Sequence, residues 1–247
     1  MHILRLPRNQ TGRDFVVGDI HGHFDEFEQL LQQVRFNPAN DRMLCVGDYI
    51  DRGPHSERAL YYLEQDWFFS VRGNHEAMLA AARDYEPGVY ELWMRNGGEW
   101  AEKIEEDVLD QFADIYETLP YVIEVEGEHG KIGVVHADVP PFDSWDDFTD
   151  ALESASLDEK AMQAMLWSRA TYRRLRLTKL YPGIYEKPTM TGVHSVYLGH
   201  SIVAQATRFG SYCFIDTGAY ANGQLTIVDI NSEEIFCIGV MNFAVGY

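Results

Sequence analysis

Short apolar runs and helical patterns alternate through the first third of the chain. Apolar runs at residues 15–17, 43–46 and 67–71 each lead into a glycine, and each is followed by a segment with helical spacing. Between residues 24 and 34, for example, apolar positions recur at steps of three and four. Three successive strand–loop–helix units predict an α/β fold with a parallel sheet flanked by helices. In such sheets functional groups gather beyond the carboxyl ends of the strands.

The next segment, at about residues 84–119, has the pattern of a helix or a helix pair. After a turn at residues 96–98, apolar residues recur at steps of four, four, four, three and four until Pro120 ends the pattern. We interpret this segment as a helical insert over one edge of the sheet, with its apolar stripe packed against the core. The stripe consists of Trp100, Ile104, Val108, Phe112, Ile115 and Leu119.

Strand patterns dominate the second half of the chain. Two helical patterns, at residues 144–155 and 159–167, interrupt them, and a basic insert at about residues 170–192 has no clear periodicity. No linker or repeat divides the chain, so we expect a single domain spanning residues 1–247. The predicted strands are residues 121–126, 131–135, 193–198, 202–207, 212–215, 225–230 and 234–240.

The charge balance narrows the choice of partners. The chain has 20 Lys and Arg residues against 39 Asp and Glu residues, a formal net charge of −19. Binding to a nucleic-acid backbone or to an anionic membrane favours a basic face, so we expect neither partner. No apolar run approaches the roughly 20 residues of a membrane helix. The start of the chain lacks the apolar core of a signal peptide, and its three cysteines are an odd number. We therefore expect a cytoplasmic protein with free thiols.

Three motifs at the ends of the first three apolar runs carry candidate metal ligands. They are Gly18–Gly22 (GDIHG), Gly47–Gly53 (GDYIDRG) and Arg72–Glu76 (RGNHE). The three motifs occupy equivalent points of the predicted fold, where a strand gives way to a loop. Their Asp, Asn and His side chains are therefore expected to converge at one edge of the sheet.

Six side chains form the predicted ligand set for two divalent metal ions. Asp19 and His21 lie two residues apart, so they share a face at an extended strand end and suit one ion. Asp48 follows the adjacent strand and is placed to reach both ions. Nitrogen and oxygen donors without a thiolate suit manganese, iron or zinc in a catalytic site. The full set is Asp19, His21, Asp48, Asn74, His136 and His200.

The residues beside these ligands predict phosphate chemistry. Two ions can share one water and lower its pKa, and the resulting metal-bridging hydroxide attacks phosphorus directly. Arg52 and Arg72 suit bidentate contacts to phosphate. His75 directly follows Asn74 and is the predicted general acid, oriented by Asp51. The alternative interpretations are structural salt bridges for the two arginines and a helix cap for Asp51.

The order G-D-x-H-G, G-D-x-x-D-R-G and G-N-H-E resembles the phosphoprotein phosphatase family of calcineurin-like metallophosphoesterases. Within that family the chain is most similar to the small bacterial and lambda-type phage serine/threonine enzymes. The resemblance continues through Trp93–Trp100, Val135–Asp138, Trp167–Arg169, Gly199–His200 and Ile215–Ala219. It implies a central β-sandwich of mixed sheets flanked by helices, and a manganese-dependent phosphomonoesterase that acts on phosphoserine and phosphothreonine.

The resemblance also implies a role for individual residues. It assigns the six predicted ligands to two ions, phosphate binding to Arg52, Arg72 and Arg169, and the acid pair to His75 and Asp51. Arg169 comes from the resemblance alone. The expected partner is a phosphorylated protein or peptide, or a small phosphate ester.

Two other functions are compatible with parts of this pattern. Dinucleoside tetraphosphate hydrolases share the metals, but the symmetrically cleaving kind typically lacks Asp51 and has Asp in place of Glu76. A non-catalytic binding module would usually have lost a ligand or the acid, and this chain retains all of them. His23 and Ser201 stand where family members often have Cys and Thr, which removes no ligand. The long basic insert is expected to alter the choice of substrate.

Overall fold

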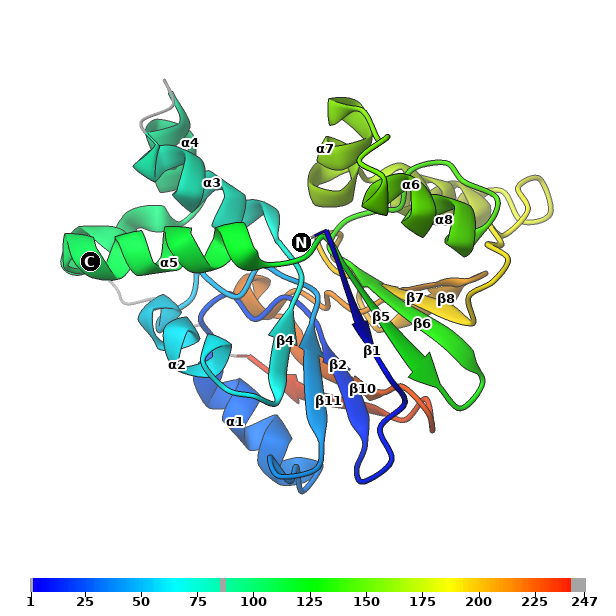
Figure 1. Cartoon of the computed structure of the whole chain (residues 1–247), viewed down its shortest axis with the longest axis horizontal. Helices are drawn as coiled ribbons and strands as arrows, with labels where there is room; N and C mark the ends of the chain where they lie inside the picture. Colours follow the sequence, from blue (N-terminus) through cyan, green and yellow to red (C-terminus); the bar gives the residue numbers. More distant parts are fainter. Residues whose placement is uncertain (1, 85–87, 241–247) are drawn as a thin grey trace.

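In a computed structural model of the chain, which describes residues 2–84 and 88–240, two β-sheets stack face to face (Figure 1). Helices cover the outer face of each sheet. The predicted sandwich of mixed sheets with helices outside is therefore confirmed. Residues 85–87, near the start of the predicted helical insert, lie outside the described part of the chain.

Both sheets mix parallel and antiparallel pairs. At one edge of the six-stranded sheet, β1 (Ile3–Leu6) and β5 (Val122–Gly127) pair in parallel. Each sheet also has three successive parallel strands: β2 (Asp14–Val17), β3 (Arg42–Cys45) and β4 (Phe68–Ser70) in one, and β6 (Gly130–Val135), β7 (Ser195–Leu198) and β9 (Tyr212–Phe214) in the other. The carboxyl ends of these strands meet at one end of the sandwich, which is where the site is built. In spatial order the five-stranded sheet contains β11 (Ile235–Gly239), β10 (Gln224–Asp229), β2, β3 and β4. The six-stranded sheet contains β1, β5, β6, β7, β9 and β8 (Thr207–Phe209).

The helices divide into two groups, one for each sheet. Five pack on the side of the five-stranded sheet: α1 (Phe24–Gln33), α2 (Ala59–Leu63), α3 (Asn74–Arg83), α4 (Val89–Arg95) and α5 (Glu106–Thr118). Three pack on the side of the six-stranded sheet: α6 (Trp145–Glu153), α7 (Glu159–Trp167) and α8 (Ala170–Leu180). Among the described residues, none of these helices has the length and apolar composition to cross a membrane.

The apolar core explains why the strand sequences are continuous apolar runs. Val16 of β2 points into the cluster between the sheets, whereas its neighbours Phe15 and Val17 join the cluster beneath the helices. All three side chains are fully buried. A strand covered on both faces has no solvent-facing positions, so its sequence shows no alternation of apolar and polar residues. The same arrangement fixes the strand ends that carry the site.

Most predicted elements are present, and three details differ. Residues 202–206 form no strand, and β8 begins only at Thr207. The basic segment contains the helix α8, which sequence spacing does not reveal because Leu175 is its one buried side chain. Trp100 lies on a separate 3₁₀ helix, residues 98–103.

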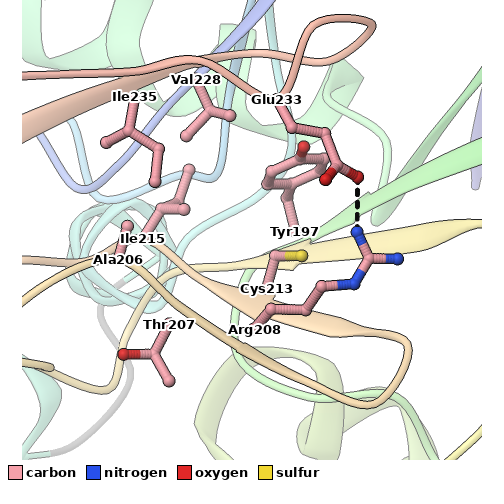
Figure 2. Close-up of a pocket in the computed structure, with 9 residues that line it drawn as sticks. All are labelled: Tyr197, Ala206, Thr207, Arg208, Cys213, Ile215, Val228, Glu233 and Ile235. Atoms are coloured by element: carbon pink, nitrogen blue, oxygen red, sulfur yellow. Dashed lines mark hydrogen bonds and ion pairs between the residues drawn. The ribbon is translucent and has the colours of Figure 1, made fainter.

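A small cavity lies between the sheets beside β8, away from the convergent strand ends (Figure 2). Tyr197 and Cys213 line it from the six-stranded sheet and Val228 from the five-stranded sheet, while Arg208 and Glu233 form an ion pair at its edge. Its volume of about 80 Å³ is enough for two or three water molecules. We interpret this cavity as imperfect packing and place the candidate active site elsewhere.

Candidate active site

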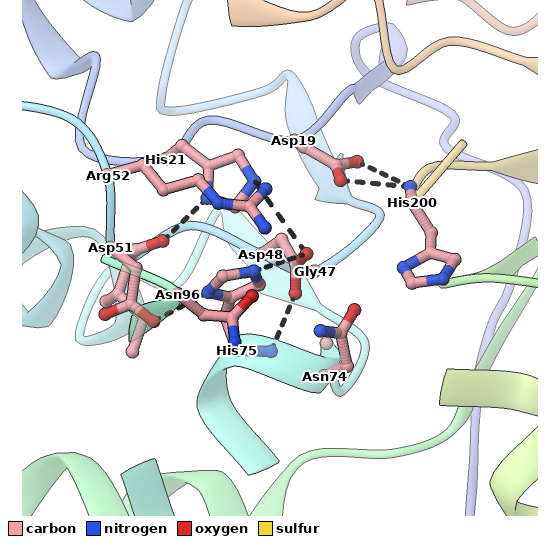
Figure 3. Close-up of polar contacts among 12 residues, drawn as sticks. Asp19, His21, Gly47, Asp48, Asp51, Arg52, Asn74, His75, Asn96 and His200 are labelled. Atoms are coloured by element: carbon pink, nitrogen blue, oxygen red, sulfur yellow. Dashed lines mark hydrogen bonds and ion pairs between the residues drawn. The ribbon is translucent and has the colours of Figure 1, made fainter. Parts of the chain in front are cut away.

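The six predicted metal ligands come together at the carboxyl ends of the parallel strands. Asp19 and His21 follow β2, Asp48 follows β3, and Asn74 is the first residue of α3 after β4. In the opposite sheet, His136 directly follows β6, and His200 lies two residues after the end of β7. All six are buried. Figure 3 shows Asp48 between the histidines, with Asp19 directed at the backbone of His200.

The backbone is strained where it delivers these side chains. Of the nine non-glycine residues with positive φ in the described chain, five lie at this site. Such left-handed conformations cost of order 1–3 kcal/mol each and persist where surrounding structure and function require them. The five are His21, Asp48, Asp51, Arg52 and His200.

The three predicted histidine ligands are held in tautomers that suit metal binding. His21 Nδ1 donates to the carbonyl of Ile50 at 2.8 Å, and His136 Nδ1 donates to the carbonyl of Val46 at 2.7 Å. The Nε2 atom of each ring is therefore unprotonated and carries a lone pair. In His200 the two ring nitrogens exchange these roles: Nε2 donates to the carbonyl of Trp167 at 3.3 Å, and Nδ1 carries the lone pair. Fixing one nitrogen on a carbonyl orients the other for a metal ion.

The contacts of His136 fit a cation particularly well. Its Nε2 lone pair lies 2.9 Å from Oδ1 of Asn74 and 3.4 Å from Oδ1 of Asp48. Three acceptor atoms facing one another repel unless a cation or proton lies among them. Burial lowers the pKa of His136, and burial lowers the pKa of His200 to about 3, so both rings are neutral near pH 7. These three acceptor atoms are suitable ligands for a metal ion.

Three buried carboxylates strengthen the same argument. Burial raises the pKa of Asp19 well above its usual range, and the nearby Asp216 and Asp48 raise it further. Burial also raises the pKa of Asp216 to about 6. Burial would raise the pKa of Asp48 too, but the surrounding histidines outweigh it and lower the value. Three carboxylates crowded in this way, with no lysine or arginine of the described chain in an ion pair with them, suit divalent cations.

Two groups of potential ligand atoms share Asp48. One group is Asp48, His136 and His200, and the other is His21, Asp48 and His75; in each, the ligand atoms lie within 4.8 Å of one another. The second group contains His75 where the sequence predicts Asp19, because the Asp19 carboxylate accepts the backbone N–H of His200 at 3.0 and 3.2 Å. The role of His75 is better judged from its own hydrogen bonds.

His75 is held by a buried carboxylate. Its Nδ1 lies 2.6 Å from Oδ2 of Asp51, and its Nε2 points toward Asp48 at 3.9 Å. The indole N–H of Trp100 donates to Asp51 at 2.7 Å, and the indole N–H of Trp93 donates at 3.0 Å. Burial raises the pKa of Asp51, whereas the donors from His75 and the two indoles lower it. The predicted His75–Asp51 contact is therefore present, with two tryptophans behind it.

Glu76 anchors the loop that carries Asp48. Its buried carboxylate accepts the backbone N–H groups of Asp48 at 3.0 Å, Tyr49 at 2.9 Å and Gly73 at 3.1 Å. These bonds tie the end of β3 to the start of α3. Glu76 thus fixes the separation between Asp48 and Asn74, the two ligands on either side of it.

The three predicted arginines occupy different surroundings. Arg52 lies with its guanidinium carbon 4.1 Å from the ring centroid of Tyr220, and its Nη1 is 3.1 Å from Nε2 of His21. Arg169 donates to the carbonyl of His200 at 3.2 Å. Arg72 lies outside the pocket, where it donates to the carbonyls at the end of α5 and stacks between tyrosines. The structure thus brings Arg52 and Arg169 to the metal ligands, but not Arg72.

An open pocket of about 340 Å³ lies over Asp48 and Asn74. Arg52 and Arg169 contribute positive charge to it, and His75 lies among its lining residues. This volume accommodates a phosphate group together with the side chain that carries it. The remaining lining residues are Asn96, Trp167, Tyr172, His200, Ile202 and Tyr220.

Comparison with known proteins identifies the family. The family model described as calcineurin-like phosphoesterase matches residues 15–190. The chain is 34% identical to serine/threonine-protein phosphatase 1 of Salmonella typhimurium over 92% of this chain and 95% of the relative. The chain belongs to the calcineurin-like phosphoesterase family. The predicted family and the predicted enzyme class, a hydrolase of phosphoric esters, are therefore confirmed.

Other relatives of this phosphoesterase agree with that placement. It is 32% identical to serine/threonine-protein phosphatase 2 of Escherichia coli, over 87% of this chain and 92% of the relative. Its similarity to a symmetrical bis(5′-nucleosyl)-tetraphosphatase of Erwinia tasmaniensis, at 32% identity, covers 53% of this chain and 46% of that protein. The likeness to the nucleotide hydrolase is thus partial.

Two solved structures share the fold of the phosphoesterase. One is described provisionally as a diadenosine tetraphosphatase, with a TM-score of 0.65, 22% identity and coverage of 98% of this chain and 99% of that one. The other is a protein serine/threonine phosphatase from Saccharomyces cerevisiae, with a TM-score of 0.61, 18% identity and coverage of 98% and 85%. At these identities the likeness speaks for the fold alone.

Sequence reasoning missed three residues of the phosphoesterase site. Asp216 follows β9, and its position after an apolar strand is the same signal that marks His136 and His200. Trp93 and Trp100 belong to the helical insert, and we interpreted Trp100 as part of an apolar stripe for packing. Their apolar rings do pack there, but their N–H groups reach Asp51. A helical period reveals the buried ring and not the direction of its one polar atom.

Proposed function

We propose that this phosphoesterase is a two-metal phosphomonoesterase that removes phosphate from phosphoserine and phosphothreonine in proteins. The observation that carries the proposal is the position of Asp48, whose carboxylate belongs to both groups of potential metal ligands and lines the pocket with two arginines. Two ions joined by one carboxylate are typical of phosphate hydrolysis.

Asp48 would hold both divalent ions. Asp19 and His21 would complete the site of one ion. Asn74, His136 and His200 would complete the site of the other. We propose manganese, with iron or zinc as alternatives, because the donors are nitrogen and oxygen without a thiolate. When bound, such a pair of ions lowers the pKa of a bound water and neutralises charge on the phosphoryl oxygens.

Residues of the chain would then bind the phosphate, hold it in line and protonate the leaving oxygen. Arg52 and Arg169 carry the guanidinium groups of the pocket, and they would bind the phosphoryl oxygens and hold phosphorus in line. Nε2 of His75 would give its proton to the departing oxygen, while Asp51 holds Nδ1 and keeps the ring in place. Arg72 would bind phosphate only after leaving the carbonyls of Glu117 and Leu119.

The choice of a protein substrate rests on two kinds of support. The relatives matched over most of both chains are named serine/threonine-protein phosphatases. Asp51 and Glu76 also stand at the two positions where symmetrical tetraphosphate hydrolases typically differ. We further propose a cytoplasmic location and no nucleic-acid or membrane partner, supported by the net charge of −19 and by free cysteines in the described chain.

The proposal is tested by stripping the protein of metal, restoring Mn²⁺ and measuring phosphate release. We expect release from phosphoserine and phosphothreonine peptides, and little turnover of diadenosine tetraphosphate. Asp114→Asn, on an exposed position of α5, is the control for handling and should match the wild type. Faster cleavage of the dinucleotide than of any phosphopeptide would contradict the choice of substrate. No turnover of any phosphate ester after metal loading would contradict the phosphatase itself.

A further inference from the structure

One segment of this acidic protein is strongly basic. Residues 169–187 contain six of the 20 Lys and Arg residues and only one of the 39 Asp and Glu residues. Most of the segment is the helix α8, which starts beside Arg169 at the pocket and lies on the outside of the six-stranded sheet with α6 and α7 (Figure 1). The reversal of charge thus begins at the mouth of the candidate active site.

Helical spacing places three of these arginines on one face of the helix. Arg169, Arg173 and Arg176 are four and three residues apart, so their side chains form a stripe along the helix. Leu175, the buried residue of α8, lies on the opposite face. Arg173 and Arg176 are both exposed. We call Arg169, Arg173 and Arg176 the basic stripe.

The two outer arginines of the basic stripe have no acidic partner in the described part of the chain. Neither Arg173 nor Arg176 forms an ion pair with any residue in 2–84 or 88–240. Several other surface arginines are paired, as Arg58 is with Asp25 and Arg83 is with Asp110. Arg174 lies on another side of α8 and lines a groove that also contains Asp143 and Glu186. Arg173 and Arg176 are therefore positive charges that form no ion pair within the described residues.

Because Arg169 lines the pocket that would hold the phosphate, the remaining stripe lies where the flank of a bound peptide would run. A helix rises about 1.5 Å per residue, so Arg173 and Arg176 lie about 6 and 10 Å along α8 from Arg169. An extended peptide advances about 3.3 Å per residue. Positions two and three residues from the phosphorylated one thus match Arg173 and Arg176 in distance along the helix.

Resting on the proposed function, we infer that the basic stripe selects phosphoproteins with acidic residues two and three positions from the phosphorylated residue. The rest of the surface is acidic and repels such substrates at a distance. The positive stripe attracts their acidic residues locally and so selects them. The contribution is to substrate binding, not to the chemical step, because neither Arg173 nor Arg176 lines the pocket.

The test compares the charge-reversed variant Arg173→Glu/Arg176→Glu with the wild type on matched phosphoserine peptides. The peptides carry Asp, Ala or Lys at positions two and three, on the amino-terminal side in one series and on the carboxyl-terminal side in another. Exposed ion pairs contribute modestly, so we expect the wild type to favour Asp over Lys peptides by roughly tenfold in kcat/KM on one side, through KM. The preference should weaken in high salt and reverse in the variant.

Matched controls separate this inference from the proposed function. Arg174→Glu makes the same charge change on another face of α8 and should keep the wild-type preference. Arg173→Ala/Arg176→Ala should abolish the preference without reversing it, and thermal melting should show that every variant is folded. Hydrolysis of p-nitrophenyl phosphate, which has no peptide flank, should be the same in all of them.

Three results would overturn the inference. Equal turnover of the Asp and Lys peptides by the wild type would overturn it and leave the phosphatase proposal intact. Hydrolysis of p-nitrophenyl phosphate but of no phosphopeptide would overturn both. Binding to phosphatidylserine vesicles that is lost in the charge-reversed variant, together with indifference to peptide charge, would assign the stripe to a membrane surface instead.

Discussion

Buried carboxylates lie at both ends of the five-stranded sheet, but only those at the amino-terminal end form ion pairs with arginines in the described chain. At the amino-terminal end, Asp14 pairs with Arg42 through two contacts of 2.6 and 2.7 Å, and Asp41 pairs with Arg13 at 2.7 Å. At the carboxyl end, Asp19 lies five residues after Asp14 on the same segment. It and its neighbours form no ion pair with a lysine or arginine of the described chain.

The difference separates residues that stabilise the fold from residues that serve the reaction. Asp14 and Asp41 have their counter-charge built into the chain, so their burial costs little. Asp19, Asp48 and Asp216 crowd one another, with histidines and Arg52 near them. They form no ion pair with a lysine or arginine of the described chain, so divalent cations would add the missing counter-charge. One end of the sheet is therefore complete as a folded structure, whereas the other suits the divalent ions that the family implies.

We expect the largest effect on activity from a substitution of Asp48, at the centre of the carboxyl end of the sheet. Asp48→Asn removes the carboxylate shared by both candidate ion sites, so we expect turnover to fall to background and manganese retention to drop. Metal content of the purified variant and hydrolysis of p-nitrophenyl phosphate measure the two effects. The unfolding transition without metal should show that the variant remains folded. A variant that keeps activity would contradict the role of Asp48.

The next effect concerns the proton and leaves the cations in place. His75→Asn should retain metal but slow hydrolysis by roughly 10²–10⁴-fold, the usual contribution of a general acid. The loss should be greatest for leaving groups of high pKa, such as phenol or serine, since these need the proton most. Rates for a series of aryl phosphates test this. An equal loss across the series would argue that His75 acts on the metals instead.

A smaller effect should follow from the tryptophans behind Asp51. Trp100→Phe keeps most of the ring and removes the N–H that lies 2.7 Å from Asp51, so we expect about a tenfold loss for poor leaving groups. Introduced together with His75→Asn, it should cause no further loss, because it acts through His75. Trp145→Phe is the matched control, since its indole donates to buried Glu124 at 2.6 Å on the other sheet. Additive losses in the double variant would contradict this assignment.

We expect the smallest effect, a modest loss of stability, from a substitution at the amino-terminal end of the sheet. Burial alone would raise the pKa of Asp41, but hydrogen bonds from Arg13 and Asn37 outweigh it and hold the pKa below its usual value. Its stabilisation is therefore fully present above about pH 4 and is lost as the pH falls through the lower native pKa. Asp41→Asn should reduce the free energy of unfolding by about 1 kcal/mol at neutral pH. Urea unfolding at pH 7 and pH 3 should show this gap narrowing, with activity at pH 7 unchanged.

Sequence reasoning recovers the complete strands and their ends better than it recovers polar contacts. The three apolar runs at the start predict β2, β3 and β4, because a buried strand must be apolar throughout. The same runs place Asp19, Asp48 and Asn74 at one edge of the sheet, and His136 and His200 follow the same rule. The convergence of the ligands was thus predictable from where strands end.

Other features were less accessible for physical reasons. Helix α8 buries one side chain, so its sequence has no apolar period to detect. Arg72 is adjacent to a ligand in sequence, but the structure turns it toward carbonyls at the end of α5, a contact across 45 and 47 residues. The donors to Asp51 come from tryptophans more than 40 residues away. Such contacts depend on tertiary packing and leave no local pattern.

The need for external cations is tested most directly by anomalous diffraction from crystals grown with Mn²⁺. The account predicts two peaks about 3.5–4 Å apart on either side of the Asp48 carboxylate, one beside Asp19 and His21 and the other beside His136 and His200. A map with no manganese at the carboxyl end of the sheet, or with manganese that Asp48 does not touch, would contradict it.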